Sequence, residues 1–250
     1  MLAERANSAL HVVGSEARSG RVALAEASGG TLVAIPVRTR LVMAGDDLPA
    51  LVAAAVRGIA RPGDALAISE TAVAIAQNRM VPAEFVRPSR LAYALSARAG
   101  VLATVNQPES LQLVIDRVGA PRVLYAGAMH VLGRLRGRRG AFYEILGDAI
   151  AAIDGYTGTL PPYERTIVFE PEDPSGVARA IAAACGAEVA IVDANDLGSA
   201  KVLGASPGIA AAAIERVLVT NPHGNGDEQT PIVVLKWRGD GPSPLLGAAA

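Results

Sequence analysis

The chain has 250 residues, of which 51% are hydrophobic and 19% are charged. This composition is sufficient for a buried core and excludes a chain that is disordered overall. The 23 Lys and Arg residues nearly balance the 24 Asp and Glu residues, giving a formal net charge of -1. That balance argues against a general nucleic-acid binder or membrane-surface binder, and the length predicts one large domain or two small ones.

Cysteine usage and hydropathy define the cellular setting that we expect. The single cysteine, Cys185, excludes an internal disulfide and a cysteine-based metal site, and we interpret it as a small buried residue on a helix. No apolar run reaches the roughly 18 residues that a membrane span needs. The N-terminal segment lacks the continuous hydrophobic stretch of a secretory signal. We therefore expect a soluble, cytoplasmic protein.

Apolar periodicity and turn residues predict strands that alternate with helices along the chain. The strands that we expect are 21–25, 31–37, 65–69, 123–128, 149–153, 189–192 and 231–237. Asp47 is the N-cap of one expected helix, and prolines begin the expected helices 88–99, 108–118, 174–185 and 207–219. Segment 70–77 either continues a strand or forms a helix.

These elements predict the α/β class in its mixed (α+β) form, with a mixed sheet and flanking helices. The N-terminal extension, 1–30, is expected to be partly ordered, and 239–250 is expected to be a C-terminal tail. The folded unit between them is expected to be 31–238, with one part of 31–90 and 220–238 and a second part of 91–219.

The segment GRLRGRRG, residues 133–140, is expected to be the turn of a hairpin between apolar arms. Its arginines are Arg134, Arg136, Arg138 and Arg139. Arginine binds phosphate and carboxylate groups in a bidentate manner, so the cluster could contact an anion. A solvated turn is the simpler interpretation, and we favour it.

Four acidic residues share a setting that suits a divalent cation. Asp154 and Asp193 each end an apolar strand, whereas Asp227 and Glu228 lie in a glycine-rich loop just before a strand. Carboxylates at such positions can hold Mg²⁺ or Mn²⁺ together with phosphate oxygens. The alternative is that aspartate at a strand end simply forms a turn.

Two turns could approach a phosphorylated ligand. The backbone N–H groups of Gly224, Asn225 and Gly226 could contact a phosphate, and the side chain of Asn195 could contact a nucleotide. Neither turn matches a Walker A or Rossmann motif, and a mobile loop is the alternative.

No residue is assigned a catalytic role from the sequence. The histidines His11, His130 and His223 lack the spacing of a metal site, and only His223 lies beside a candidate site. No motif for a serine- or cysteine-based acyl enzyme is present.

Several segments, taken in order, resemble one known family. They are Ala44-Gly45-Asp46-Asp47-Leu48, DALAISETAVAIAQNRMVP, the strand that ends at Asp154, VAIVDAND and GDEQTPIVVLKWR. Their order is similar to that in the coenzyme F-420-0:L-glutamate ligases, the γ-glutamyl ligases of deazaflavin cofactor synthesis. The likeness is distant and covers most of 31–238.

The resemblance implies an enzyme that uses GTP and Mg²⁺ or Mn²⁺. Such an enzyme joins L-glutamate to a carboxylate acceptor as an amide and forms an intertwined homodimer with a two-lobed fold. By position, Asp154 and Asp193 match metal-binding aspartates of the family, and Asp227 and Glu228 match an acidic glycine-rich loop. The implied partners are small-molecule substrates, with no nucleic acid and no membrane.

The chain departs from the family after Asp193. The family's threonine and arginine are replaced there by the turn Ala194-Asn195-Asp196-Leu197-Gly198, and segment 133–147 does not match closely. These departures indicate a divergent branch, whose acceptor need not be the deazaflavin coenzyme. A non-catalytic module of the same fold, binding a nucleotide or metabolite, is the alternative.

Overall fold

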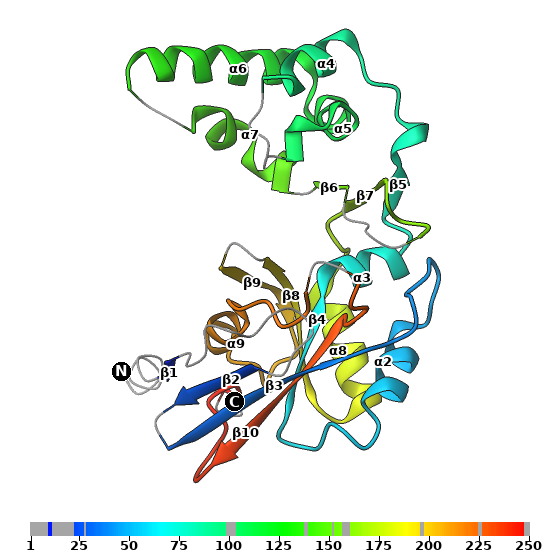
Figure 1. The fold of residues 1–250 in the computed structure, drawn as a ribbon, viewed down its shortest axis with the longest axis vertical. Helices are drawn as coiled ribbons and strands as arrows, with labels where there is room; N and C mark the ends of the chain where they lie inside the picture. Colours follow the sequence, from blue (N-terminus) through cyan, green and yellow to red (C-terminus); the bar gives the residue numbers. More distant parts are fainter. Residues whose placement is uncertain are drawn as a thin grey trace. The chain divides into compact units, whose positions relative to one another are not determined.

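A computed structural model describes residues 10–11, 23–27, 29–98, 104–137, 140–151, 153–156, 161–195, 198–224 and 227–247. The chain forms two compact units (Figure 1). Unit 1 comprises Met1–Asn78 and Pro171–Ala250, and unit 2 comprises Arg79–Glu170. The mixed α/β class expected from the sequence is confirmed.

Unit 1 is built on a seven-stranded sheet with the order β1-β2-β3-β10-β4-β8-β9. The strands are β1 (Leu10–His11), β2 (Ala23–Ala27), β3 (Gly30–Val37), β4 (Ala65–Ser69), β8 (Glu188–Asn195), β9 (Ser199–Ala205) and β10 (Ile232–Gly239). Only the pair β4–β8 is parallel within this sheet; the other neighbours are antiparallel. The sheet is therefore mixed, as predicted.

Helices cover both faces of this sheet (Figure 1). They are α2 (Leu48–Val56), α3 (Glu70–Ala76), α8 (Pro174–Cys185) and α9 (Ala211–Leu218). The N-terminus of α2 is capped as expected, because the Ala50 N–H donates to Asp47 Oδ1 at 3.0 Å. Ile214 and Leu218 of α9 belong to the same buried cluster as Val233 and Leu235 of β10, so these apolar side chains leave water together.

Unit 2 combines a small antiparallel sheet, of order β5-β7-β6, with four α-helices. Its strands are β5 (Met80–Pro82), β6 (Ile153–Tyr156) and β7 (Thr166–Phe169). Its helices are α4 (Arg90–Ser96), α5 (Pro108–Val118), α6 (Ala120–Leu135) and α7 (Ala141–Ala151), with 3-10 turns at Ala83–Phe85 and Thr104–Asn106. A core of its own, including Leu111, Leu146 and Ile167, holds these elements together.

The strand expected at 123–128 and the hairpin expected around 133–140 are wrong. Residues 123–128 lie inside α6, and 136–140 connect α6 to α7. Val123 and Ala126 are buried whereas Leu124 is exposed, so burial follows the period of a helix and not the alternation of a strand. The strand expected at 149–153 is likewise displaced, because α7 extends to Ala151 and β6 begins at Ile153.

The boundary between the two parts of the chain also differs from the prediction. Residues 171–219 belong to unit 1, because β8 pairs with β4 along its length and α8 packs against α2. Segment 79–90 belongs to unit 2. The parallel pairing of β4 and β8 joins segments more than a hundred residues apart, which local sequence patterns do not reveal.

Both ends of the chain contribute to unit 1. The short strand expected near 21–25 is β2, which pairs with β3. The C-terminal segment was expected to be a tail, yet Leu245 is fully buried in the core of unit 1. The Ala210 N–H donates to the Leu245 carbonyl at 2.8 Å, and the Gly247 N–H donates to the Gly208 carbonyl at 2.9 Å. Burial of one leucine thus fixes this segment beside α9.

Lys236, one of the two lysines in the sequence, forms an ion pair with Asp64 at the end of the sheet where β4 begins. Lys236 of β10 donates to Asp64 Oδ2 at 2.7 Å and to the carbonyl of Ile59. The side chains of Lys236 and Asp64 are only 17% and 13% exposed. Because water solvates them poorly, each charge depends on the other.

We expect Lys236→Met to lower the free energy of unfolding by about 1–3 kcal/mol, because it leaves the Asp64 carboxylate half-buried without its cation. Urea unfolding followed by circular dichroism measures this change. Arg238→Met, at an exposed position of the same strand, is the matched control and should change stability by less than about 0.5 kcal/mol. Equal effects of the two substitutions would contradict the prediction.

Candidate active site

Several strand ends meet at one edge of the unit 1 sheet. Ile232, the first residue of β10, lies opposite both Val37, the last residue of β3, and Ile68 of β4. Ser69, the last residue of β4, lies opposite Val192 of β8. We call this the site edge: the C-terminal ends of β3, β4 and β8 with the N-terminal ends of β9 and β10. Open α/β sheets bind ligands outside the C-terminal ends of their parallel strands, which here are β4 and β8.

Asp193 lies at the site edge, on β8, directly opposite Lys201 of β9. Its side chain is half-buried. Burial raises the pKa of the Asp193 carboxyl above its ordinary value, and the positive charge of Lys201 offsets only part of that effect. A carboxylate whose charge is poorly solvated is a suitable ligand for a cation.

Asn195 ends β8 two residues further on. Its side-chain oxygen accepts a hydrogen bond from the Ser199 N–H at 3.3 Å, across the turn to β9. This contact joins the two ends of the turn between β8 and β9. Asp196 and Leu197 of the same turn lie outside the described residues.

The acidic loop, His223–Thr230, also reaches the site edge, and two hydrogen bonds close its base. Nδ1 of His223 lies 3.2 Å from the Thr230 carbonyl, to which its N–H donates, and the Thr230 hydroxyl donates to the His223 carbonyl. Asp227 is exposed and Glu228 is half-buried. The base of the loop is thus held in place, while Asn225 and Gly226 of its predicted phosphate turn lie outside the described residues.

Backbone contacts attach the end of this loop to β4 and to the segment that follows β3. The Thr39 N–H donates to the Gln229 carbonyl at 2.9 Å, and the Ser69 N–H donates to the Pro231 carbonyl at 2.9 Å. Neighbouring strands are about 4.8 Å apart, so the backbone at Pro231 lies roughly 10 Å from that of β8. The acidic loop and Asp193 therefore belong to the same edge of one sheet.

Two buried polar atoms beside the loop lack a hydrogen-bond partner within the described residues. They are Nε2 of His223 and the hydroxyl oxygen of Thr220. Because the Nδ1 proton of His223 is donated to Thr230, its Nε2 is an acceptor in the neutral ring. Both atoms are suited to contact a polar group or water at the base of the loop.

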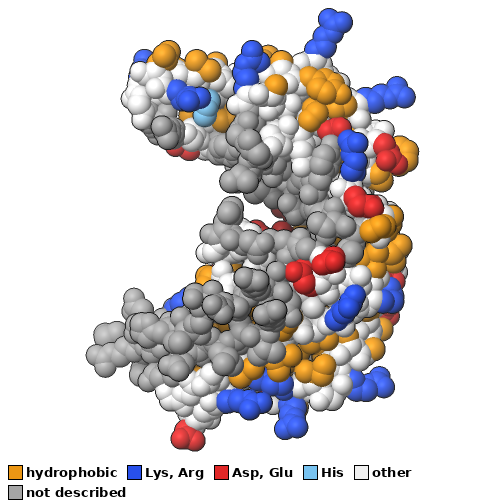
Figure 2. All heavy atoms as spheres, in the orientation of Figure 1, with side chains coloured by type: hydrophobic (Ala, Val, Ile, Leu, Met, Phe, Trp, Pro, Cys, Tyr) orange, Lys and Arg blue, Asp and Glu red, His pale blue; other side chains and the backbone are white. Residues whose placement is uncertain are grey.

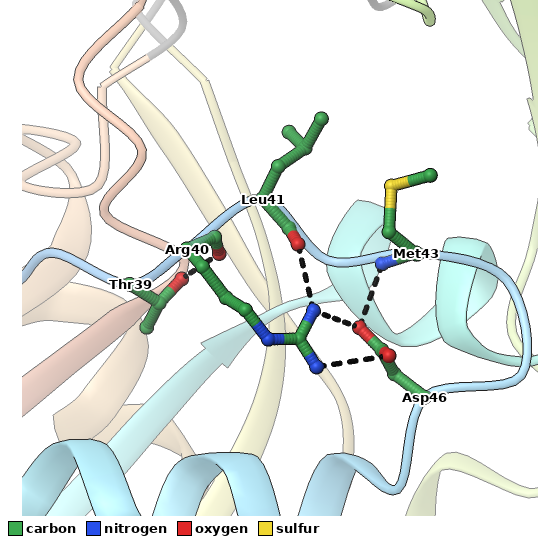
Figure 3. A network of polar contacts seen from close by, with 5 residues as sticks. All are labelled: Thr39, Arg40, Leu41, Met43 and Asp46. Carbon is green, nitrogen blue, oxygen red and sulfur yellow. Dashed lines mark hydrogen bonds and ion pairs between the residues drawn. The ribbon is translucent and has the colours of Figure 1, made fainter.

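An ion pair that the sequence analysis missed orders the segment after β3 (Figure 3). The Arg40 guanidinium donates two hydrogen bonds to the Asp46 carboxylate, at 2.7 and 2.9 Å, and the Met43 N–H donates a third at 2.8 Å. These bonds hold the pKa of Asp46 below its ordinary value. The Gly45-Asp46-Asp47 sequence could have signalled this pairing, but only Asp47 was interpreted.

Asp154 belongs to the other unit, where it lies on β6 opposite Val168. Its side chain lies outside the described residues, so its role as a metal ligand stays a prediction. No group of three His, Cys, Asp or Glu side chains suited to a metal ion occurs within the part of the chain that is described. Gly224 is the first residue of the predicted phosphate turn. Its N–H donates to the Asn221 carbonyl at 3.1 Å.

Other candidates from the sequence lie at the ends of helices. Arg134 and Arg136 are exposed near the C-terminal end of α6, while Arg138 and Arg139 lie outside the described residues. Cys185 ends α8, and burial raises the pKa of its thiol, as expected for an unreactive residue on a helix.

Comparison with known proteins agrees with the resemblance seen in the sequence. Residues 36–141 match the model of the family described as F420-0:Gamma-glutamyl ligase. The matched region begins at the end of β3 and includes the Arg40–Asp46 ion pair and the end of β4, but neither Asp193 nor the acidic loop. A search of curated proteins found no match.

The environment of His223 makes stability depend on pH. Burial lowers its pKa from 6.5 to about 4, although the hydrogen bond to the Thr230 carbonyl opposes this effect. As the pH falls from about 6.5 to 4, the unfolded chain takes up a proton that the native protein does not, so native stability decreases. The shift corresponds to a loss of about 3 kcal/mol, and it has no effect above pH 7.

We expect His223→Asn to flatten this dependence, because its amide can donate to Thr230 but does not titrate in this range. Urea unfolding at neutral pH and near pH 4 measures the difference. If the wild-type protein and the variant lose stability in parallel as the pH falls, His223 is not the responsible group.

Proposed function

We propose that this protein is a metal- and nucleotide-dependent amide ligase, because residues 36–141 match the model of the F420-0:Gamma-glutamyl ligase family. It joins L-glutamate, or a similar amino acid, to a carboxylate acceptor. The family match is the observation that carries this proposal. The half-buried carboxylate of Asp193 and the acidic loop, both at the site edge, add a setting suited to a charged ligand.

The reaction proceeds through an acyl phosphate. A carboxylate is a poor acyl donor, so the γ-phosphoryl group of GTP is first transferred to the acceptor carboxylate and GDP is released. The amine of glutamate then attacks the acyl carbon, the amide bond forms, and inorganic phosphate leaves with the electron pair of the broken C–O bond. Because such transfers depend on positioning and charge neutralisation, no covalent nucleophile is required.

The residues of the site edge offer carboxylate oxygens, which are suitable ligands for a hard divalent cation. Asp193 offers a carboxylate oxygen whose charge is only partly balanced by Lys201. Asp227 and Glu228 would supply further oxygens, and Asn195 with residues 224–226 would approach the nucleotide. When bound, Mg²⁺ or Mn²⁺ neutralises phosphate charge during transfer.

We expect Asp193→Asn to weaken Mn²⁺-dependent GTP binding at least about tenfold, because the substitution removes a charged ligand. The same substitution should leave the melting temperature unchanged or raise it, because it removes a charge that burial disfavours. Calorimetric titration of GTP with and without Mn²⁺, together with thermal unfolding, measures both effects.

Asp240→Asn is the matched control, since Asp240 is exposed and follows β10 at the opposite end of the sheet. It should change neither property. A lower melting temperature with unchanged GTP binding in Asp193→Asn would instead assign Asp193 a structural pairing with Lys201.

Turnover separates the ligase from a non-catalytic binding module of the same fold. Wild-type protein with GTP, Mn²⁺, L-glutamate and F420-0 should release phosphate in step with formation of the glutamyl product. Metal-linked GTP binding without phosphate release would support the binding module. Phosphate release that needs glutamate but occurs only with another carboxylic acid would support a ligase with a different acceptor.

The acidic loop can be tested by substituting its carboxylates. We expect Asp227→Ala or Glu228→Ala to abolish metal-dependent GTP binding while the melting temperature of the ligand-free protein barely changes, because the loop base is held by His223 and Thr230 instead. A large loss of stability would indicate a structural role for the acidic residue. Unchanged affinity in both variants would exclude the loop from the site.

The proposal includes the homodimer that the resemblance implies. Light scattering across a wide range of concentration should then give twice the chain mass of 25.5 kDa. A monomer at every concentration would remove the dimer from the proposal without affecting the ligase reaction.

A further inference from the structure

Helix α6 of unit 2 exposes large apolar side chains that contribute to no core. Leu124, Val131 and Leu135 are 51%, 60% and 81% exposed, and Tyr125 and Leu132 beside them are exposed as well. The helix packs on its own unit through Val123 and Ala126. We call the five exposed residues, Leu124, Tyr125, Val131, Leu132 and Leu135, the apolar stripe.

The spacing of the stripe places it on one side of the helix. Positions 124, 131 and 135 are separated by seven and four residues, so they lie above one another. Tyr125 and Leu132 form a second row beside them. At a rise of about 1.5 Å per residue the stripe is roughly 17 Å long, so it is a continuous surface and not a set of isolated side chains.

The charge of this region is entirely positive. Residues 118–143 contain five arginines and neither Asp nor Glu. Arg134 and Arg136 are exposed near the C-terminal end of the stripe, and the Arg122 guanidinium at its other end donates to the Ile145 carbonyl at 3.2 Å. Arg138 and Arg139 lie outside the described residues. Basic and hydrophobic side chains lie together along the upper rim of Figure 2, over α6 and α4. The balanced charge of the whole chain thus conceals a strongly basic segment.

We propose that α6 binds the surface of an anionic lipid bilayer. In this arrangement the apolar stripe enters the boundary between headgroups and acyl chains, and the exposed Arg134 and Arg136 contact lipid phosphates. Tyr125 suits the same boundary, where amphipathic rings are favoured. No helix within the described ranges is long and apolar enough to cross a membrane, so α6 lies on the surface of the bilayer.

The charge distribution distinguishes this partner from three others. A second copy of the chain would bring an identical stripe with the same arginines and, over 118–143, no carboxylate to offset them. Nucleic acid would neutralise the arginines but would leave Leu124, Val131 and Leu135 in water. An acidic protein groove would need to enclose a helix, whereas α6 is already packed on its own unit and offers one face. An anionic bilayer satisfies both the apolar and the basic features.

Vesicle sedimentation with the full chain tests the proposal. Wild-type protein should sediment with vesicles of phosphatidylcholine mixed with phosphatidylglycerol, and salt should weaken this binding because it screens the arginines. Binding to vesicles of phosphatidylcholine alone should be much weaker. No sedimentation with the mixed vesicles, or equal binding to both kinds, would overturn the proposal.

Substitutions separate the contribution of the arginine charges to vesicle binding from that of the apolar side chains. Arg134→Gln with Arg136→Gln should weaken binding about 25-fold, at about fivefold for each charge. Val131→Ser with Leu135→Ser should weaken it at least about tenfold. All four positions are exposed, so the folded state should survive, and circular dichroism checks this.

The controls remove similar groups from other surfaces. Arg57→Gln with Arg61→Gln removes two exposed charges from unit 1, and Phe85→Ser removes an apolar side chain that is 74% exposed. These variants should bind like the wild-type protein. If the stripe variants convert a dimer into a monomer and the wild-type protein does not bind vesicles, the stripe is a subunit interface and the proposal is wrong. None of these outcomes depends on ligase activity.

Discussion

The insertion of β10 between β3 and β4 is the constraint on which the rest of unit 1 depends. The last strand of the chain pairs with the strand near residue 30 on one side and with β4 on the other. Its first four residues, Ile232–Leu235, are almost completely buried. Because every backbone N–H and C=O of a buried central strand needs a partner, this pairing brings the two ends of the chain together and fixes the register of the sheet.

The site edge is a consequence of that register. Since Ile232 is level with Val37 and Ile68, the loop that precedes β10 must emerge beside the ends of β3 and β4. The parallel pairing of β4 and β8 then places Asp193 at the same edge. A loop held at its base by His223 and Thr230 can present Asp227 at that edge without depending on it for stability. Such a division of roles, with a rigid sheet and a loop carrying the ligands, is common in binding sites.

The net charge of the chain is nearly zero, but positive and negative side chains are distributed unevenly along it. Both lysines lie opposite aspartates, Lys236 with Asp64 and Lys201 with Asp193. The first pair closes the far end of the sheet, and the second leaves a carboxylate whose charge is incompletely compensated. In unit 2, by contrast, the segment around α6 has arginines without carboxylates.

The sequence by itself determined the mixed α/β class, the capped helix after Asp47 and the helices Pro108–Val118 and Pro174–Cys185, because caps, prolines and periodicity are local signals. It also identified the acidic loop and Asp193 as candidates. It did not reveal α6 as a helix, the strand β9 or the burial of Leu245. Only the tertiary structure decided the burial of Leu245, the division into two units and the meeting of Asp193 with the acidic loop, because each depends on contacts between segments far apart in the chain. Burial and strand register are properties of those contacts, and no local pattern encodes them.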